Sequence, residues 1–234
     1  MINKISSTAY TLSFWPLKPV PVEKDLGVYI DTELKFTDHI SIKVSKAKQM
    51  VNIIRSTFKY LKPSTFKLLY TSLVRPHLEY CTPVWSPHLR KDILRVESVQ
   101  RRATRMITGF SDMSYEERLT ALDLPTLEYR RLRADLILLY NHTENLVNLD
   151  LQTFCPRCPG KLMFEPAINH QTRGHSKKFQ IQHHPGARSH FFSTRSLPIW
   201  NVLKEKTVSA KSLNAFKNSL KSDPAMPNKF QIRL

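Results

Sequence analysis

The sequence predicts a mainly α-helical protein: a short N-terminal β-hairpin, then a helical bundle, then a loop-rich basic C-terminal segment with short helices. Two patterns carry this prediction. Apolar residues recur at three- and four-residue steps from residue 37 to residue 142, the spacing of one helix face. Beyond Asn145 this periodicity is lost until about residue 190. With 234 residues, of which 41% are hydrophobic, the chain can fill one sizeable core or two small ones.

The charge of the chain is strongly unbalanced, with 36 Lys and Arg against 19 Asp and Glu, a formal net charge of +17. This favours a polyanionic partner, with nucleic acid as the first candidate and an anionic membrane as the second. No apolar run is long enough to cross a membrane, and no apolar segment follows Met1 that would mark a secretory signal. The three cysteines are too few for a disulfide framework. The expected location is intracellular, in the nucleus, the cytoplasm or both.

The opening stretch to Asp31 predicts strand, turn and strand. It carries three prolines and then the apolar run Leu26–Ile30. Two strands are not stable alone. They need either a sheet whose other strands lie outside this chain or the helices that follow.

The first two helices are expected over residues 37–61 and 64–80. The apolar stripe of the first consists of Ile40, Val44, Ala47, Val51, Ile54 and Phe58. The second should turn Phe66, Leu69, Leu73 and Val74 inward. Pro63 fits its first turn, Pro76 should kink or end it, and residues 81–87 then form a connector.

Three further helices complete the bundle. The third spans residues 89–108 and stops at Gly109, a residue type typical of helix C-termini. Ser114 and Glu117 form a capping box that opens the fourth, which ends before Pro125. The fifth, over residues 126–142, is apolar on most sides and should be central.

Beyond Asn145 the pattern indicates a basic, His-rich linker to about residue 190, as a loop or partly disordered segment. Order should resume at Phe191. Ser212 should cap a last short helix with Leu213, Phe216 and Leu220 on one face. The tail after Asp223 is expected to fray.

The third helix offers the candidate binding surface. Its core side consists of Ile93, Val96, Val99, Ala103, Met106 and Ile107. Its basic residues project within an arc of about 140° on the other side: Arg90, Lys91, Arg95, Arg101, Arg102 and Arg105. Solvated helix faces normally mix charges, yet Asp92 and Glu97 both lie outside this arc. We therefore favour contact with phosphates over an ordinary charged face.

The first helix could widen this surface, because Lys43, Lys46, Lys48, Arg55 and Lys59 flank its apolar stripe. By contrast, Arg130, Arg131 and Arg133 of the fifth helix point in scattered directions. Asp135 lies four residues from Arg131, which suggests an ion pair within the helix. A structural role is the better interpretation for these three arginines.

The spacing Cys-x2-Cys-x11-His-x4-His joins Cys155, Cys158, His170 and His175, one residue short of the usual zinc-finger interval. Pro166 interrupts the stretch that should be helical in a finger. Two free thiols in a loop are the favoured interpretation, and no metal is predicted.

No catalytic set is visible in the sequence. Two-metal polymerase chemistry needs carboxylates held close together, but the aspartates are scattered singly. The adjacent pair Glu116 and Glu117 is explained by the capping box. Five glycines in all provide no phosphate-binding loop. The chain is expected to be no enzyme on its own and to need no cofactor.

A set of strings is nevertheless distinctive. In order along the chain these are Lys24–Asp31, Leu34–Phe36, His39–Ile40, Leu73–Tyr80, Pro83–Pro87, Val99–Thr104, Tyr115–Leu119, Leu124–Arg131, Thr172–His175, Phe191–Ser193 with Arg195, and Trp200–Asn201 with Leu203. They resemble the region after the palm in reverse transcriptases of non-LTR (LINE-type, jockey-like) retrotransposons. The resemblance covers residues 10–220.

In that family the catalytic aspartates lie upstream of the string that begins here at Lys24, so the resemblance implies a non-catalytic C-terminal part of an RNA-directed DNA polymerase. Residues 1–31 would end the palm, 32–145 would form a helical thumb-like domain, 146–190 a linker, and 191–234 a small helical segment. The implied partners are RNA and DNA, as an RNA/DNA hybrid or template–primer duplex, together with an upstream palm domain that would hold Mg²⁺. No membrane partner is implied.

Two alternatives remain open at this point. The chain could complete an enzyme whose palm belongs to another chain. It could equally be a relic or domesticated interaction module without a polymerase role, its basic face meeting an acidic protein or a membrane surface.

Overall fold

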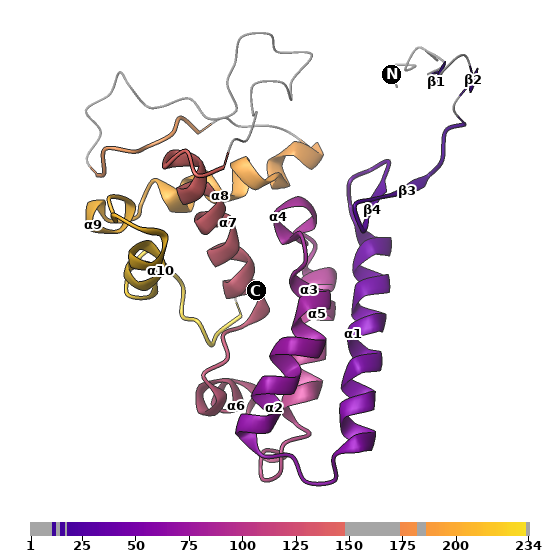
Figure 1. Cartoon of the computed structure of the whole chain (residues 1–234). Coiled ribbons are helices and arrows are strands. Elements are labelled where there is room, and N and C mark those ends of the chain that lie inside the picture. Colours follow the sequence, from indigo (N-terminus) through magenta and orange to yellow (C-terminus); the bar gives the residue numbers. More distant parts are fainter. Residues whose placement is uncertain (1–10, 13–14, 17, 148–173, 182–185, 233–234) are drawn as a thin grey trace.

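The computed structural model describes residues 11–12, 15–16, 18–147, 174–181 and 186–232 (Figure 1). It confirms the predicted fold class: an N-terminal antiparallel hairpin followed by helices. The hairpin consists of β3 (Val22–Asp25) and β4 (Val28–Asp31). Its turn residues Leu26 and Gly27 have φ values of 43° and 85°, as a tight hairpin turn requires. A second short antiparallel pair joins β1 (Thr11–Leu12) and β2 (Trp15–Pro16).

The hairpin is held by the helix that follows it. Val28 of β4 is buried in the core together with Ile40 of α1 (Thr37–Thr57). The Asp31 carboxylate accepts hydrogen bonds from the backbone N–H groups of Glu33, Lys35 and Phe36, which shapes the turn into α1. The sequence left open whether these strands pair with a sheet outside the chain or pack on the following helices. The structure shows packing on α1.

Helix α1 is shorter than predicted, and this moves one aromatic residue. Ile40, Val44, Ala47, Val51 and Ile54 are buried as expected. The helix ends at Thr57 instead of Leu61, and Phe58 has an extended backbone. The prediction that Phe58 belongs to the apolar stripe is wrong, because its side chain is 38% exposed.

The second predicted helix is divided by a wide turn. It consists of α2 (Pro63–Leu69), the π-helical η1 (Tyr70–Val74) and α3 (Arg75–Glu79). The Arg75 N–H donates to the Tyr70 carbonyl, so the chain absorbs Pro76, which has no N–H, without ending the helix. Because of the wide turn, side chains spaced four residues apart stay on the buried side of this segment. The buried side chains are Phe66, Tyr70, Val74 and Leu78, whereas Leu73 is 45% exposed, contrary to prediction.

The predicted connector contains a further helical turn, α4 (Thr82–Trp85). Trp85 is buried there, and its Nε1 donates to the Tyr80 carbonyl at 2.6 Å. Helix α5 (Arg90–Thr104) ends four residues earlier than predicted, followed by turns up to Gly109 with φ 84°.

Helices α6 (Tyr115–Leu122) and α7 (Leu127–Thr143) are close to their predicted bounds. The capping box of α6 is confirmed, since the Ser114 hydroxyl accepts from the Glu117 N–H and the Glu117 carboxylate from the Ser114 N–H. The Thr126 hydroxyl caps α7 in a similar way.

The C-terminal part contains η2 (Gly186–His190), α8 (Phe192–Trp200), α9 (Glu205–Val208) and α10 (Leu213–Lys221). The Ser212 cap of α10 is confirmed, whereas α9 was not predicted. The expectation of a frayed tail is wrong: the Lys229 carbonyl accepts from the Thr126 N–H at 2.8 Å. Most of the predicted linker, residues 148–173, lies outside the described residues.

Two apolar clusters form the interior of the part of the chain that the structure describes, and α7 joins them. The first extends from Val28 to Leu127 and packs α1, α2, α3, α5 and α6 together. The second contains Leu136, Leu139 and Tyr140 of α7 with residues of α8, α9 and α10. In Figure 1, α7 lies between the long α1/α5 side and the group of short C-terminal helices, in agreement with its predicted central position.

Candidate nucleic-acid interface

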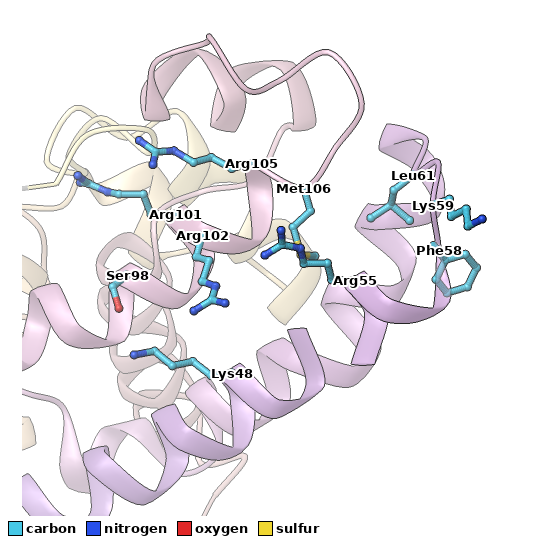
Figure 2. A pocket seen from close by; sticks show the side chains of 10 residues that line it. All are labelled: Lys48, Arg55, Phe58, Lys59, Leu61, Ser98, Arg101, Arg102, Arg105 and Met106. Atoms are coloured by element: carbon cyan, nitrogen blue, oxygen red, sulfur yellow. The ribbon is translucent and has the colours of Figure 1, made fainter. Parts of the chain in front are cut away.

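A groove of about 810 Å³ lies between α1 and α5. Six of its ten lining residues are Lys or Arg, and none is acidic. The basic residues are Lys48, Arg55, Lys59, Arg101, Arg102 and Arg105, and the others are Phe58, Leu61, Ser98 and Met106 (Figure 2). We call this the basic groove. It unites three of the six cations of the predicted basic face with three of the five predicted from the first helix.

The packing of the two helices explains why these cations meet. Both helices bury their apolar stripes in the first cluster, so the flanking rows of the two helices face the same cleft. Two hydrogen bonds run from α5 to α1: Arg95 Nη2 to Ser41 Oγ at 2.9 Å, and Arg102 Nη2 to Asn52 Oδ1 at 3.3 Å. They fix the neighbouring flanks of α1 and α5 side by side.

The two acidic residues of α5 are buried and do not line the basic groove. Asp92 and Glu97, which lie outside the basic arc, are 2% and 1% exposed. The Glu97 carboxylate accepts from the Tyr115 hydroxyl and, at 3.0 Å, from the Leu127 N–H at the start of α7. Burial raises the pKa of Glu97, and the hydrogen bond from Tyr115 opposes that shift. The groove therefore keeps an unopposed positive field.

The six groove cations take part in no ion pair within the part of the chain that the structure describes. The Arg101 guanidinium lies over the Tyr115 ring, 4.9 Å from its centroid, a contact that leaves its charge available. In Figure 2, Arg55 and Arg102 extend into the space between the helices, whereas Lys59 points away from it. A polyanion entering the groove would meet these cations without first displacing a carboxylate.

The basic groove is lined by fewer of the predicted cations than the sequence proposed. Arg90, Lys91 and Arg95 are exposed on α5 but do not line the groove. Lys43 lies over the Tyr80 ring, 5.6 Å from its centroid, on the other flank of the α1 stripe. Neither Lys43 nor Lys46, which the sequence had added to the candidate surface, lines the basic groove.

Arg130 and Arg131 of α7 have the structural surroundings that the sequence favoured, whereas Arg133 is half-buried and joins no ion pair in the described part of the chain. Arg130 forms a two-pronged ion pair with Glu79 of α3. Arg131 is 4% exposed. The predicted pair between Arg131 and Asp135 is replaced by one across helices, since Arg195 of α8 donates to both Asp135 oxygens, at 2.9 and 3.1 Å.

The zinc alternative falls mostly outside the described residues, which include neither Cys155, Cys158 nor His170. His175 is described and buried, and its Nε2 lies 2.8 Å from the Trp200 carbonyl. Burial lowers its pKa. Within the described ranges, no group of three or more His, Cys, Asp or Glu side chains could hold a metal ion.

Sequence reasoning missed the apolar part of the groove. Phe58 was assigned to the core, because a helical wheel extended past the end of α1 places it there. Met106 was also assigned to the core, and it does pack against the first cluster while lining the groove. An earlier end of α1 was not signalled, since no Gly or Asn follows Thr57.

Among the residues that the structure describes, no helix is long and apolar enough to cross a membrane. No family model matches the chain, and no solved structure matches it. An uncharacterized protein of Caenorhabditis elegans is 24% identical over 111 residues, which is 46% of this chain and 56% of that protein. The match thus spans little more than half of the relative, whose name states no activity.

Proposed function

We propose that this chain binds nucleic acid through the basic groove, as the thumb-like, non-catalytic C-terminal part of a retrotransposon-type RNA-directed DNA polymerase. One observation carries the binding proposal: six Lys and Arg side chains from two helices line one groove without an acidic residue. The polymerase context rests on the sequence resemblance described above. In that context a palm domain outside this chain supplies the Mg²⁺-binding carboxylates, and this chain alone polymerises nothing.

The groove suits phosphates better than base edges. Arginine and lysine ends bind phosphate oxygens, and each contact releases counterions from the nucleic acid. Such contacts hold the duplex in place but carry no sequence information. We therefore expect sequence-tolerant, salt-sensitive binding of a template–primer duplex, with an RNA/DNA hybrid as the first probe.

The test removes three groove charges at once. In the variant Arg55→Gln/Arg102→Gln/Arg105→Gln, affinity for the hybrid should fall across sequences. The slope of log affinity against log salt should flatten by about two to three units, close to one per lost contact. The measurement is a salt titration of hybrid affinity by fluorescence anisotropy, for wild type and variant.

A matched control carries the same loss of charge elsewhere. Lys204, Lys206 and Lys211 are exposed on the C-terminal part, away from the groove. Changing all three to Gln should leave most of the affinity intact. If both triple variants lose affinity equally, net charge and not the groove drives binding. Equal competition by anionic vesicles or poly-glutamate would favour the interaction-module alternative.

A further inference from the structure

The loop at one end of the basic groove carries two aromatic residues, which phosphate binding alone does not require. Residues 58–62, here called the aromatic loop, read Phe-Lys-Tyr-Leu-Lys between α1 and α2. Its first two residues, with Arg55 before them, line the groove. Figure 2 shows Phe58 and Lys59 together at the end of α1, beside Leu61.

One residue anchors this loop and two aromatic residues project from it. Leu61 is 3% exposed, and its carbonyl accepts from the Thr108 N–H at 3.3 Å. Phe58 is 38% and Tyr60 84% exposed. Neither ring stacks on another ring in the described part of the chain. An anchored backbone thus presents two aromatic faces next to cations.

We infer that the groove takes nucleic acid carrying unpaired bases, and that an unpaired base stacks on Phe58 while Arg55 and Arg102 hold the adjoining phosphates. This inference rests on the proposed function and specifies its ligand as single-stranded nucleic acid or a duplex with a single-stranded extension.

The groove can select this ligand because unpaired bases differ from paired ones in the surface that they expose. In the interior of a duplex both faces of every base are covered by neighbours, so phosphate contacts are all that a groove of this kind can make. An unpaired base leaves its π-face free, and stacking on an aromatic side chain then adds affinity whatever the base. Phe58 lines the same groove as the six cations, so base and backbone can be bound together.

An anionic membrane could also be met by lysines alternating with aromatic residues. The groove argues against this use of Phe58, because a concave basic site fits a phosphate chain better than a flat lipid surface. Membrane binding is accordingly an outcome that the test must be able to show.

The experiment compares two labelled probes, a blunt RNA/DNA hybrid and the same hybrid with a single-stranded extension. Wild-type protein should bind the extended probe more tightly. Phe58→Ala should weaken that complex about tenfold and leave the blunt complex nearly unchanged. Phe58→Trp, unlike Phe58→Ala, should keep the preference for the extended probe. Only the extended probe should then quench the fluorescence of the introduced indole.

A control separates stacking from general apolar contact. Leu68 is 68% exposed on the neighbouring α2 but does not line the groove, so Leu68→Ala should alter neither complex. Phe58→Leu keeps an apolar side chain without a π-face and should behave as Phe58→Ala does.

Each result has one meaning. Equal binding of both probes, with Phe58→Ala unchanged and the groove charges still needed, would overturn the stacking inference and leave the proposed function intact. Salt-insensitive binding, or binding indifferent to the groove charges, would overturn both. Phe58-dependent capture by phosphatidylserine vesicles, with no preference between the nucleic acid probes, would assign the aromatic loop to a membrane.

Discussion

The arginines of α5 and those of α7 and α8 belong to the same molecule but have opposite surroundings. In the basic groove, Arg102 donates to the Asn52 amide oxygen, and neither Arg102 nor Arg105 pairs with an acid among the residues that the structure describes. At α7 and α8, Arg130 is paired with Glu79 and Arg195 with Asp135. The positions of the acids, and not the number of arginines, separate a binding surface from a structural network.

Glu97 belongs to both regions. It lies on α5, yet its carboxylate faces away from the groove, toward Leu127 and Tyr115. It also favours the charged form of Arg131, whose pKa burial would otherwise lower further. Because its carboxylate faces inward, Glu97 leaves the groove without an acidic lining residue and stabilises the start of α7.

The largest effect is expected from breaking that inward contact. Glu97→Ala leaves the Leu127 N–H, the Tyr115 hydroxyl and the charge of Arg131 without their carboxylate in the core. The free energy of unfolding should fall by about 3–5 kcal/mol. Urea denaturation followed by circular dichroism measures this. Glu116→Ala, at an exposed position of α6, should cost only about 0.5 kcal/mol; equal losses would remove the distinction between buried and exposed acids.

The next effect concerns a buried group that carries no charge at neutral pH. His39 is 0% exposed, its Nδ1 accepts from the Tyr29 N–H at 3.2 Å, and its ring lies 4.9 Å from that of Trp85. Burial, with a smaller contribution from Lys43, lowers its pKa from 6.5 to about 4.

Because the folded pKa of His39 is the lower one, the unfolded chain binds its proton first as the pH falls. Stability should be intact above pH 6.5 and decline toward pH 4, by up to about 3 kcal/mol. His39→Gln removes this titration, so its unfolding free energy should depend less on pH across that window. Parallel pH profiles for wild type and variant would show that His39 is not responsible.

The smallest effect is expected where the cations are exposed. The groove variant Arg55→Gln/Arg102→Gln/Arg105→Gln should change the unfolding free energy by no more than about 0.5 kcal/mol per site, since no ion pair is lost. Arg131→Gln, in the buried network, should cost more than about 1 kcal/mol. Thermal melts of both proteins decide this, and the reverse order would contradict the contrast between the two regions.

The sequence predicted the features that local chemistry determines. The α1 stripe, the Ser114 capping box and the basic arc of α5 all depend on side chains a few residues apart, so helical geometry suffices to place them. It also placed Asp92 and Glu97 off the basic face. Their burial depends on tertiary packing instead, since Glu97 is bonded by Tyr115 and by Leu127 of other elements.

The misses have tertiary causes. Leu73 is exposed because a π-helical turn changes the repeat before Pro76, and nothing local signals such a turn. The tail is ordered by the Thr126 backbone and by an ion pair of Lys229 with Asp123, both about a hundred residues away in sequence. Asp135 bonds Arg195 for the same reason: the partner comes from a distant helix.

The sharing of α7 between the two apolar clusters has a consequence for folding. Its first turn belongs to one cluster through Leu127, and its last turns to the other through Leu136, Leu139 and Tyr140. Unfolding of α7 would expose both apolar clusters to water, so the two halves should unfold as one cooperative unit. A shortened chain that stopped after α7 would expose those three side chains to water and tend to self-associate, whereas one that kept α8 to α10 would bury them.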